Sequence, residues 1–347
     1  MSEAEPTQTK PGALWRARTL VARALTAAGG RGGAILILLA LIIAFSLASE
    51  SFLTVDNLRN ILRQYSVPAI LAVGQTIVIV SAGIDLSVAS TAALSGSVMG
   101  VMYAHEGYPE PVALLLGLAA GFAVGAVNGF VITKWRVPDF IATLGAFTAV
   151  RGIALLVTDG LPVPDYTKAQ EGRTVPETVT KLGADSVFGI PLIAVVAAVC
   201  ALIGWFILSR TTLGRSAYAI GGNREAARVS GIRVERTKWA IYVFSGLMAA
   251  IAGFMLTGRQ GSANALMGEG MELQSIAAVV VGGTNLFGGE GTIGGTIIGV
   301  LIIGVLNNGL NILGVADFWQ RVVNGSIIVA VVALDQWRRR AAAAREA

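Results

Sequence analysis

Long apolar stretches recur along this chain and leave few folds open to it. A helix needs about 20 mostly apolar residues to cross the ~30 Å hydrocarbon layer of a bilayer. Hydrophobic residues make up 54% of the chain, charged residues make up 14%, and the mean hydropathy is +0.70. We therefore predict an all-α, polytopic membrane protein. The apolar segments correspond to about ten transmembrane helices, at 33–49, 66–82, 86–104, 111–133, 139–157, 189–208, 239–257, 273–287, 293–314 and 318–334. The pair within 66–104 also fits broken or re-entrant helices.

The distribution of Lys and Arg predicts which span ends face the cytoplasm, because basic residues near span ends are retained there. Basic residues collect in four places, namely an N-terminal arm (1–32), the turn 134–136, the loop 209–238 and the tail (337–347). A ten-span permease domain over 33–336 puts all of these on one side, so both termini are predicted to be cytoplasmic. The loop 158–188 then lies outside and carries more acids than bases. Arg59 and Arg63 are the exception, because this scheme also places them outside.

No group of residues has the spacing of a catalytic or metal site. The glycine-rich run GGTNLFGGEGTIGG contains no Lys to reach a phosphate, so it does not match a nucleotide-binding loop. Cys200 and His105 are the single cysteine and histidine of the chain. We expect Cys200 to pack within a span and His105 to lie in a solvated loop. The sequence predicts no catalytic residue, metal or bound cofactor.

Charge excludes two further classes of function. The net charge of +5 comes from basic residues beside the spans and not from a patch with interleaved aromatics, so no nucleic-acid partner is expected. Acidic residues are scarce inside the spans, which argues against a proton- or sodium-coupled carrier. If this protein works against a gradient, the energy enters through another subunit.

Several polar side chains nevertheless fall inside apolar spans. A polar group in hydrocarbon needs a partner or a wet cavity. We therefore treat a set of amides and hydroxyls as candidates for a translocation pathway, namely Gln75, Thr76, Asn128, Thr143, Asn307, Asn308 and Gln320. Hydrogen bonds between helices explain each of them about equally well. Asp85, just after a span, is expected to cap a helix that begins at Leu86.

Glycines recur at helical spacing in two spans. Gly117, Gly121, Gly125 and Gly129 form one set, and Gly291, Gly295 and Gly299 form another. Residues four apart share a helix face, so each set predicts a bare ridge that a second helix can approach closely.

The segment Thr211–Val234 is a glycine-punctuated, basic hook between two spans. Asn223 is suited to cap a helix of one or two turns over Arg224–Ser230, and Gly231 is suited to end it in the left-handed conformation. A helix this short is unstable in water by itself, so we expect it to dock on another protein. Ala226 and Ala227 would offer a small, smooth surface for docking. The alternative is an ordinary cytoplasmic loop.

At these residues the chain resembles a known family. EAARVSG resembles the EAA-type signature that forms the coupling helix of ABC-importer permeases. Three longer segments, 74–90 (GQTIVIVSAGIDLSVAS), 211–232 and 272–315, resemble the ribose/xylose/arabinose/galactose permease family. The likeness extends over about residues 35–336.

The resemblance implies a permease of the vitamin-B12-type importer fold in the bacterial inner membrane. It implies a second permease subunit, identical or paralogous, two cytoplasmic ATPase subunits that bind ATP-Mg, and an external sugar-binding protein. It also implies that coupling to ATP hydrolysis rests on Gly214, Arg215, Gly221, Asn223, Glu225, Ala226, Ala227 and Gly231.

Two alternatives remain open at this stage. Branched-chain amino-acid permeases belong to a related superfamily, although the GIDLS and GGTNLFGG blocks favour sugar. A secondary carrier or channel would have no use for a hook that docks an ATPase. The sequence does not name the sugar.

Overall fold

The computed structural model describes residues 31–165, 167–170, 172–316, 318–326, 329–330 and 333. Almost all of the predicted N-terminal arm and the whole of the tail 337–347 lie outside the described residues. The elements are α2 (Arg31–Ala48), α3 (Val55–Val80), α4 (Val88–Ala104), α5 (Glu110–Lys134), α6 (Asp139–Thr158), α7 (Glu177–Ala184), β1 (Ser186–Val187), β2 (Ile190–Pro191), α8 (Leu192–Arg210), α9 (Thr212–Gly222), α10 (Arg224–Val229), α11 (Val234–Gln260), α12 (Met271–Val281) and α13 (Ile293–Ile312). Residues 318–326 are also helical.

Helices of membrane-spanning length confirm the predicted class. Within the described residues, α5, α6, α8, α11 and α13 are five helices long and apolar enough to cross a bilayer. The chain is therefore a multi-pass membrane protein. Each predicted span from 33–49 to 293–314 overlaps a helix, but the count of about ten spans remains a prediction. The predicted span 273–287 extends too far, because α12 ends at Val281 and a glycine-rich loop follows.

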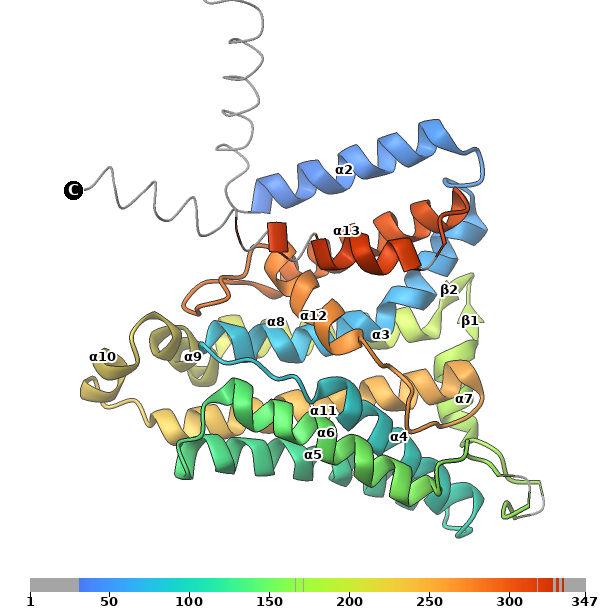
Figure 1. Cartoon of the computed structure of the whole chain (residues 1–347), viewed down its shortest axis with the longest axis horizontal. Coiled ribbons are helices and arrows are strands. Elements are labelled where there is room, and N and C mark those ends of the chain that lie inside the picture. Colours follow the sequence, from blue (N-terminus) through green and yellow to red (C-terminus); the bar gives the residue numbers. More distant parts are fainter. Residues whose placement is uncertain are drawn as a thin grey trace, which may run out of the picture.

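The fold is not purely helical. Strands β1 and β2 form a short antiparallel hairpin beside α7, with Ser186 opposite Pro191. They are the only paired strands among the residues described. In Figure 1 the hairpin lies at the opposite end of the molecule from α9 and α10.

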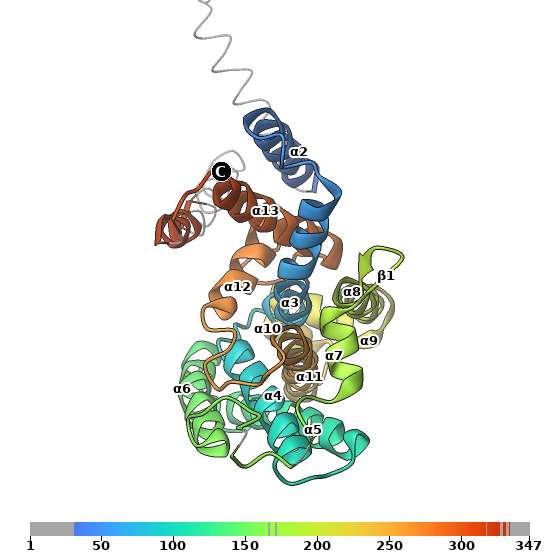
Figure 2. The ribbon, with the colours of Figure 1, turned by 90° about the vertical axis from the view of Figure 1, so that its right-hand side faces the viewer.

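Helix α11 lies at the centre of the helix packing. In its most apolar window 78% of residues are buried, against 17% in α6. It packs against α3, α4 and α5, and Figure 2 shows it enclosed by these helices and α7. A second layer, α2, α12 and α13, lies on the other side of α3. We infer that α6 and α8, which are largely exposed, present broad faces to lipid or to other subunits.

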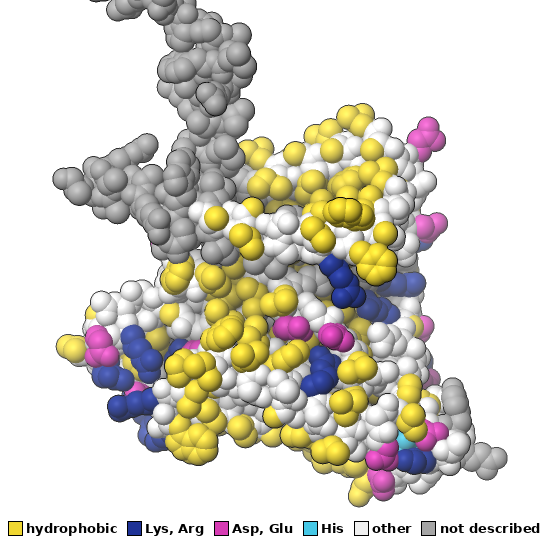
Figure 3. Space-filling model, in the orientation of Figure 1, with side chains coloured by type: hydrophobic (Ala, Val, Ile, Leu, Met, Phe, Trp, Pro, Cys, Tyr) yellow, Lys and Arg dark blue, Asp and Glu magenta, His cyan; other side chains and the backbone are white. Residues whose placement is uncertain are grey.

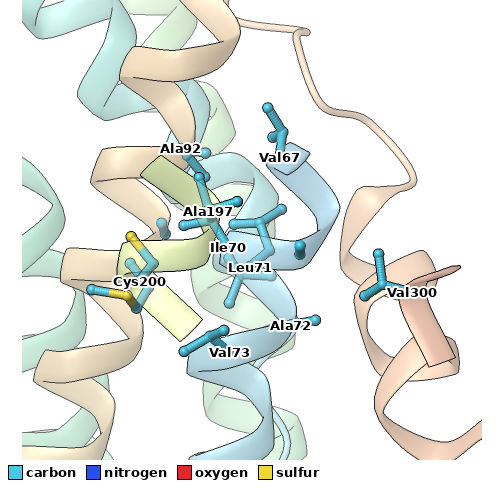
Figure 4. Close-up of a cluster of buried hydrophobic side chains, with 14 of the residues drawn as sticks. Val67, Ile70, Leu71, Ala72, Val73, Ala92, Ala197, Cys200 and Val300 are labelled. Atoms are coloured by element: carbon cyan, nitrogen blue, oxygen red, sulfur yellow. The ribbon is translucent and has the colours of Figure 1, made fainter. Parts of the chain in front are cut away.

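An apolar cluster joins the two layers. Figure 4 shows side chains of α3 between Ala197 and Cys200 of α8 and Val300 of α13. Cys200 is buried in this cluster, which confirms the prediction that it packs inside the protein.

The connecting loops gather at two ends, as the predicted alternation of spans requires. At one end, the backbone N–H of Gly289 donates to the Val80 carbonyl (2.9 Å), and Lys238 pairs with Asp139. At the other end, Val163 and Ala263 form an isolated bridge. We call these the hook end, which carries α9 and α10, and the hairpin end, which carries β1 and β2 (Figure 1).

The first glycine ridge lies where α5 meets α11. A Cβ atom added at Gly121 would lie 2.6 Å from the Gly246 carbonyl oxygen, and one added at Gly125 would lie 2.9 Å from the Val243 Cα. A Cβ atom added at Gly117 would lie 2.7 Å from the Phe254 ring, and one added at Gly129 would lie 3.0 Å from the Trp239 Cα, both in α11. The predicted close approach of a second helix is therefore confirmed for this ridge.

The second ridge is only partly as predicted. Gly295 and Gly299 pack against backbone atoms of Gly282 and Ala278, at the end of α12. Gly291 lies before α13 begins, with φ 154°, so it belongs to the preceding loop and not to the helical ridge.

Gly125→Val should force α5 away from α11. Overpacking of this kind costs about 1–3 kcal/mol, so the apparent melting temperature of the detergent-purified protein should fall. Gly145→Val in α6 is the matched control, because no atom lies within 4 Å of a Cβ added there. Equal melting temperatures for the two variants would contradict the close packing.

Candidate coupling and translocation site

The hook has the local structure that its sequence predicts. The Asn223 side chain caps α10 by accepting a hydrogen bond from the backbone N–H of Ala226 (2.9 Å), and Gly231 has a left-handed φ of 84°. Asn223 also ends α9, so the two short helices meet at this residue. Glu225 lies on the surface and pairs with Arg228 (3.3 Å), and Arg215 is exposed on α9.

The two alanines of α10 do not share one exposed face. Ala227 is 4% exposed and packs with Ile220 and Val234 inside the protein. Ala226 is exposed, and Val229 is 87% exposed. The exposed apolar surface of α10 is therefore formed by Ala226 and Val229, and the expectation of an open methyl face at Ala227 is wrong.

The glycines of the hook allow close backbone contact. A Cβ atom at Gly214 would overlap the Leu208 carbonyl, and one at Gly221 would overlap the Val80 carbonyl at the end of α3. The same Val80 oxygen accepts the hydrogen bond from Gly289. The Tyr218 hydroxyl donates to the Gly291 carbonyl (2.7 Å). Helix α9 is thus fastened to both the end of α3 and the loop 282–292.

The SAGIDLS turn between α3 and α4 holds a buried carboxylate. Asp85 accepts hydrogen bonds from the Ser87 backbone N–H (3.0 Å), the Ser87 hydroxyl (2.7 Å) and the Ser245 hydroxyl of α11 (2.8 Å). Burial raises the pKa of this carboxyl, and the hydrogen bonds from Ser87 and Ser245 act in the opposite direction. Helix α4 begins at Val88, two residues beyond the predicted Leu86, so Asp85 caps the turn before the helix.

Three predicted pathway residues converge on this turn. The Asn128 amide donates to the Ser87 hydroxyl (2.9 Å), and the Thr143 hydroxyl donates to the Ile84 carbonyl (3.1 Å). With its side-chain oxygen facing the Asp85 N–H, Gln75 bonds both backbone groups of Asp85, at 3.1 and 3.2 Å. These side chains hold the turn in place, as the alternative of hydrogen bonding between helices predicts.

The other pathway candidates lie elsewhere. Thr76 shares a hydrogen bond with Thr296 of α13 (2.7 Å). Asn308 and Asn57 exchange two amide hydrogen bonds (2.8 and 2.9 Å) near the hairpin end. Gln320 donates to the Val315 carbonyl (3.0 Å). The side-chain amide oxygen of Asn307 is buried and has no hydrogen-bond partner among the described residues. The seven candidates therefore do not form one continuous line in a single subunit, and their role in transport remains a prediction.

Sequence reasoning missed an ion pair next to the hook. Lys238 of α11 pairs with Asp139, the first residue of α6, and both are largely buried. The Tyr242 hydroxyl also donates to Asp139 (2.8 Å) and lies 3.4 Å from the Ile84 carbonyl. The sequence contained an indication of this pair. Lys238 directly precedes the predicted span 239–257, and Asp139 follows a proline at the start of the predicted span 139–157. The pair ties the exit from the hook to the α5–α6 turn and to SAGIDLS.

A second charged group lies toward the hairpin end. The Arg151 guanidinium donates to the Ala265 carbonyl (2.6 Å) and the Met267 carbonyl (3.1 Å). One oxygen of the nearby Glu272 is buried and unpaired within the described residues. Figure 3 shows acidic and basic side chains near the middle of a face that is otherwise largely apolar. Arg151 thereby holds the loop before α12 against α6.

Comparison with known proteins places the chain in a family. The sequence model of the family described as "Branched-chain amino acid transport system / permease component" matches residues 57–332. The chain belongs to this permease family. No solved structure matches it.

Relatives of this permease carry names of sugar transporters. It is 44% identical over 304 residues to the ribose import permease protein of Bacillus subtilis (strain 168), covering 88% of this chain and 92% of the relative. It is 40% identical to the D-allose transport system permease protein of Escherichia coli (strain K12), covering 86% and 90%. It is 34% identical to the xylose transport system permease protein of the same strain, covering 87% and 91%. The resemblance to ribose/xylose-type permeases is confirmed.

Lys238→Met should destabilise the permease strongly, because it leaves the Asp139 carboxylate buried without its cation. Breaking a buried ion pair costs about 3–5 kcal/mol. The double variant Asp139→Asn with Lys238→Met should recover much of this loss in apparent melting temperature. Arg236→Met is the control, since Arg236 is exposed two residues away. Additive losses in the double variant would contradict direct coupling.

Proposed function

We propose that this permease is the membrane-spanning subunit of an ATP-driven importer that moves a monosaccharide across the bacterial inner membrane. The names of its relatives, which refer to ribose, allose and xylose, favour sugar over branched-chain amino acids. The particular sugar is left open by these names. Family membership also favours an importer subunit over a secondary carrier.

The contact of α9 with both the end of α3 and the loop before α13 carries this proposal. Gly221 rests on the end of α3, and Tyr218 binds the loop that leads into α13. A force applied to the hook therefore reaches α3 and α13 directly. It reaches α6 and α11 through Lys238 and Asp139. A loop that only connected two spans would need none of these contacts.

In this proposal, α10 enters a cleft of a cytoplasmic ATPase. Its exposed face, Ala226 and Val229, would contact the ATPase, while Ala227 holds α10 to the permease. Gly214 and Gly221 allow α9 to pack closely against neighbouring backbone. Asn223 and Gly231 define the two ends of α10. Arg215 and Glu225 would contribute polar contacts at the rim. ATP-Mg would bind to the partner, and this chain would perform no chemistry.

The remaining parts of the assembly follow from the family. A second permease subunit, identical or paralogous, would form the pathway together with this one in a vitamin-B12-type arrangement. Among the polar candidates, the half-buried Gln320 would be closest to it, whereas Asn307 is buried within this subunit. The hook end and both termini would face the cytoplasm. The hairpin end would receive an external sugar-binding protein, which would set most of the selectivity.

Val229→Glu should leave the permease folded but reduce ATPase stimulation by about tenfold or more, as expected for an apolar anchor at a protein interface. Val229→Leu is the matched control, because it keeps an apolar side chain at the same exposed position of α10. Ala227→Arg should instead disorder the hook itself and lower the melting temperature. Normal stimulation of the ATPase by the Val229→Glu variant would show that α10 is not part of the ATPase interface.

Substrate-dependent ATP hydrolysis in proteoliposomes tests the function as a whole. The permease would be reconstituted with its ATPase and binding protein and supplied in turn with pentoses, hexoses, polyols and branched-chain amino acids. We expect stimulation by a sugar and only in the presence of the binding protein. Stimulation by an amino acid would overturn the substrate class, and uptake without ATP would overturn the importer mechanism.

A further inference from the structure

An open apolar groove lies between α3, α8 and α13. Its volume is about 720 Å³. Most of its lining is aliphatic or aromatic, including Leu62 and Ala69 of α3, Ala198 and Trp205 of α8, and Ile297 of α13. The hydroxyl of Ser66, which also lines it, is already bonded to the Leu62 carbonyl (2.5 Å). The groove therefore suits a hydrocarbon ligand.

The length of the groove matches one leaflet of a bilayer. Along α8 its lining extends from Ala194 to Trp205. At 1.5 Å per residue this distance is about 16 Å. The hydrocarbon layer is ~30 Å thick, so the groove covers roughly half of it. One acyl chain entering from the hairpin end would occupy this depth.

A polar pocket adjoins the groove at the hairpin end. Its volume is about 360 Å³, and its lining includes Arg59 and Arg63 of α3 with Ser186 and Gly189 of the hairpin. Arg59 and Leu62 are three residues apart on α3, as are Arg63 and Ser66, so each arginine shares a helix face with a residue of the groove. Arg59 therefore lies beside Leu62 and Ser66 on the surface of α3, and the polar pocket borders one edge of the groove.

The arginines have spare capacity for an anion. Arg63 donates one hydrogen bond to the Ser186 hydroxyl (3.1 Å), while its Nε is buried without a hydrogen-bond partner in the described part of the chain. Arg59 donates to the Gly189 carbonyl (2.8 Å) and pairs with Asp56 (3.2 Å). Asp56 is the one carboxylate lining this pocket, and its side chain is 89% exposed. Two guanidinium groups against one exposed carboxylate leave the pocket positive.

The rim of the pocket is also suited to a membrane surface. Phe188, at the tip of the hairpin, is 100% exposed, and Val187 and Ile190 beside it are about half exposed. Exposed apolar side chains such as Phe can enter the boundary between headgroups and acyl chains, where arginines also extend toward the headgroups. This setting explains why the outside arginines that break the positive-inside pattern are located here.

We propose that the groove and its arginine pocket bind one anionic phospholipid, with a phosphate against Arg59 and Arg63 and an acyl chain between α3, α8 and α13. The charged pocket beside the apolar groove distinguishes this site from the general lipid contact of a membrane helix. A guanidinium group matches phosphate geometry and binds it with charge-assisted hydrogen bonds. The lipid would fill the seam between the two helical layers and stabilise the permease. This inference does not depend on which substrate is transported.

Native mass spectrometry of the purified permease in mild detergent tests the site. The protein would be equilibrated with equal amounts of phosphatidylglycerol and phosphatidylcholine, and the lipid retained by each molecule would be counted. We expect the wild type to retain one phosphatidylglycerol preferentially. Arg63→Gln should reduce this preference by about tenfold, because a hydrogen bond to a charged group is lost. Lys181→Gln is the control, since Lys181 is a paired surface cation at the same end.

A second pair of variants tests the groove without altering charge. Ala198→Trp should fill it and abolish retention of phosphatidylglycerol, whereas Val199→Trp, exposed on a neighbouring face of α8, should not. Equal retention of both lipids by the wild type would overturn the proposal. So would an Arg63 variant that behaves like the Lys181 variant. Loss of permease dimers on Ala198→Trp, with lipid retention unchanged, would assign the groove to a second copy of the chain instead.

Discussion

Every backbone amide and carbonyl inside a bilayer needs a hydrogen-bond partner from the protein, and helices meet this need within one segment. Lipid tails do not drive such helices together, so their association depends on how closely their surfaces fit. Here the fit comes from glycine. Gly121, Gly125 and Gly129 bring α5 against the backbone of α11, and α11 in turn supports α3 and α4. The position of the hook depends on this central packing.

Polar contacts at the hook end connect several helices that lie far apart in sequence. Asp85, buried between α3 and α4, is held by Ser87 and Ser245. Lys238 and Asp139 join α11 to α6, and Tyr242 brings the pair within reach of the same turn. An unpaired polar group in this environment is costly, so these contacts persist or change as a unit. That behaviour would suit the proposed transmission of force from a partner ATPase to several helices.

Some of the site was predictable because it depends on neighbours in sequence. The cap at Asn223, the short helix after it and the left-handed Gly231 follow from local rules and are present. The exposed face of α10 was not predictable, because Ala227 is buried by Ile220 and Val234 from flanking segments. Gln75 and Asn128 were identified as polar residues in spans, but only the fold brings them to the SAGIDLS turn.

Hydropathy and glycine spacing alone established a multi-pass helical membrane protein with closely packed spans, because both are properties of single segments in a bilayer. Family motifs added the permease assignment. Tertiary structure decided which polar groups meet. It also decided that α9 touches the end of α3 and the loop before α13. Finally, it placed the two arginines that break the positive-inside pattern beside an apolar groove. Those outcomes depend on the rotation and depth of each helix relative to the others. Helix rotation and depth are set by side-chain packing between segments far apart in sequence, which no single segment encodes.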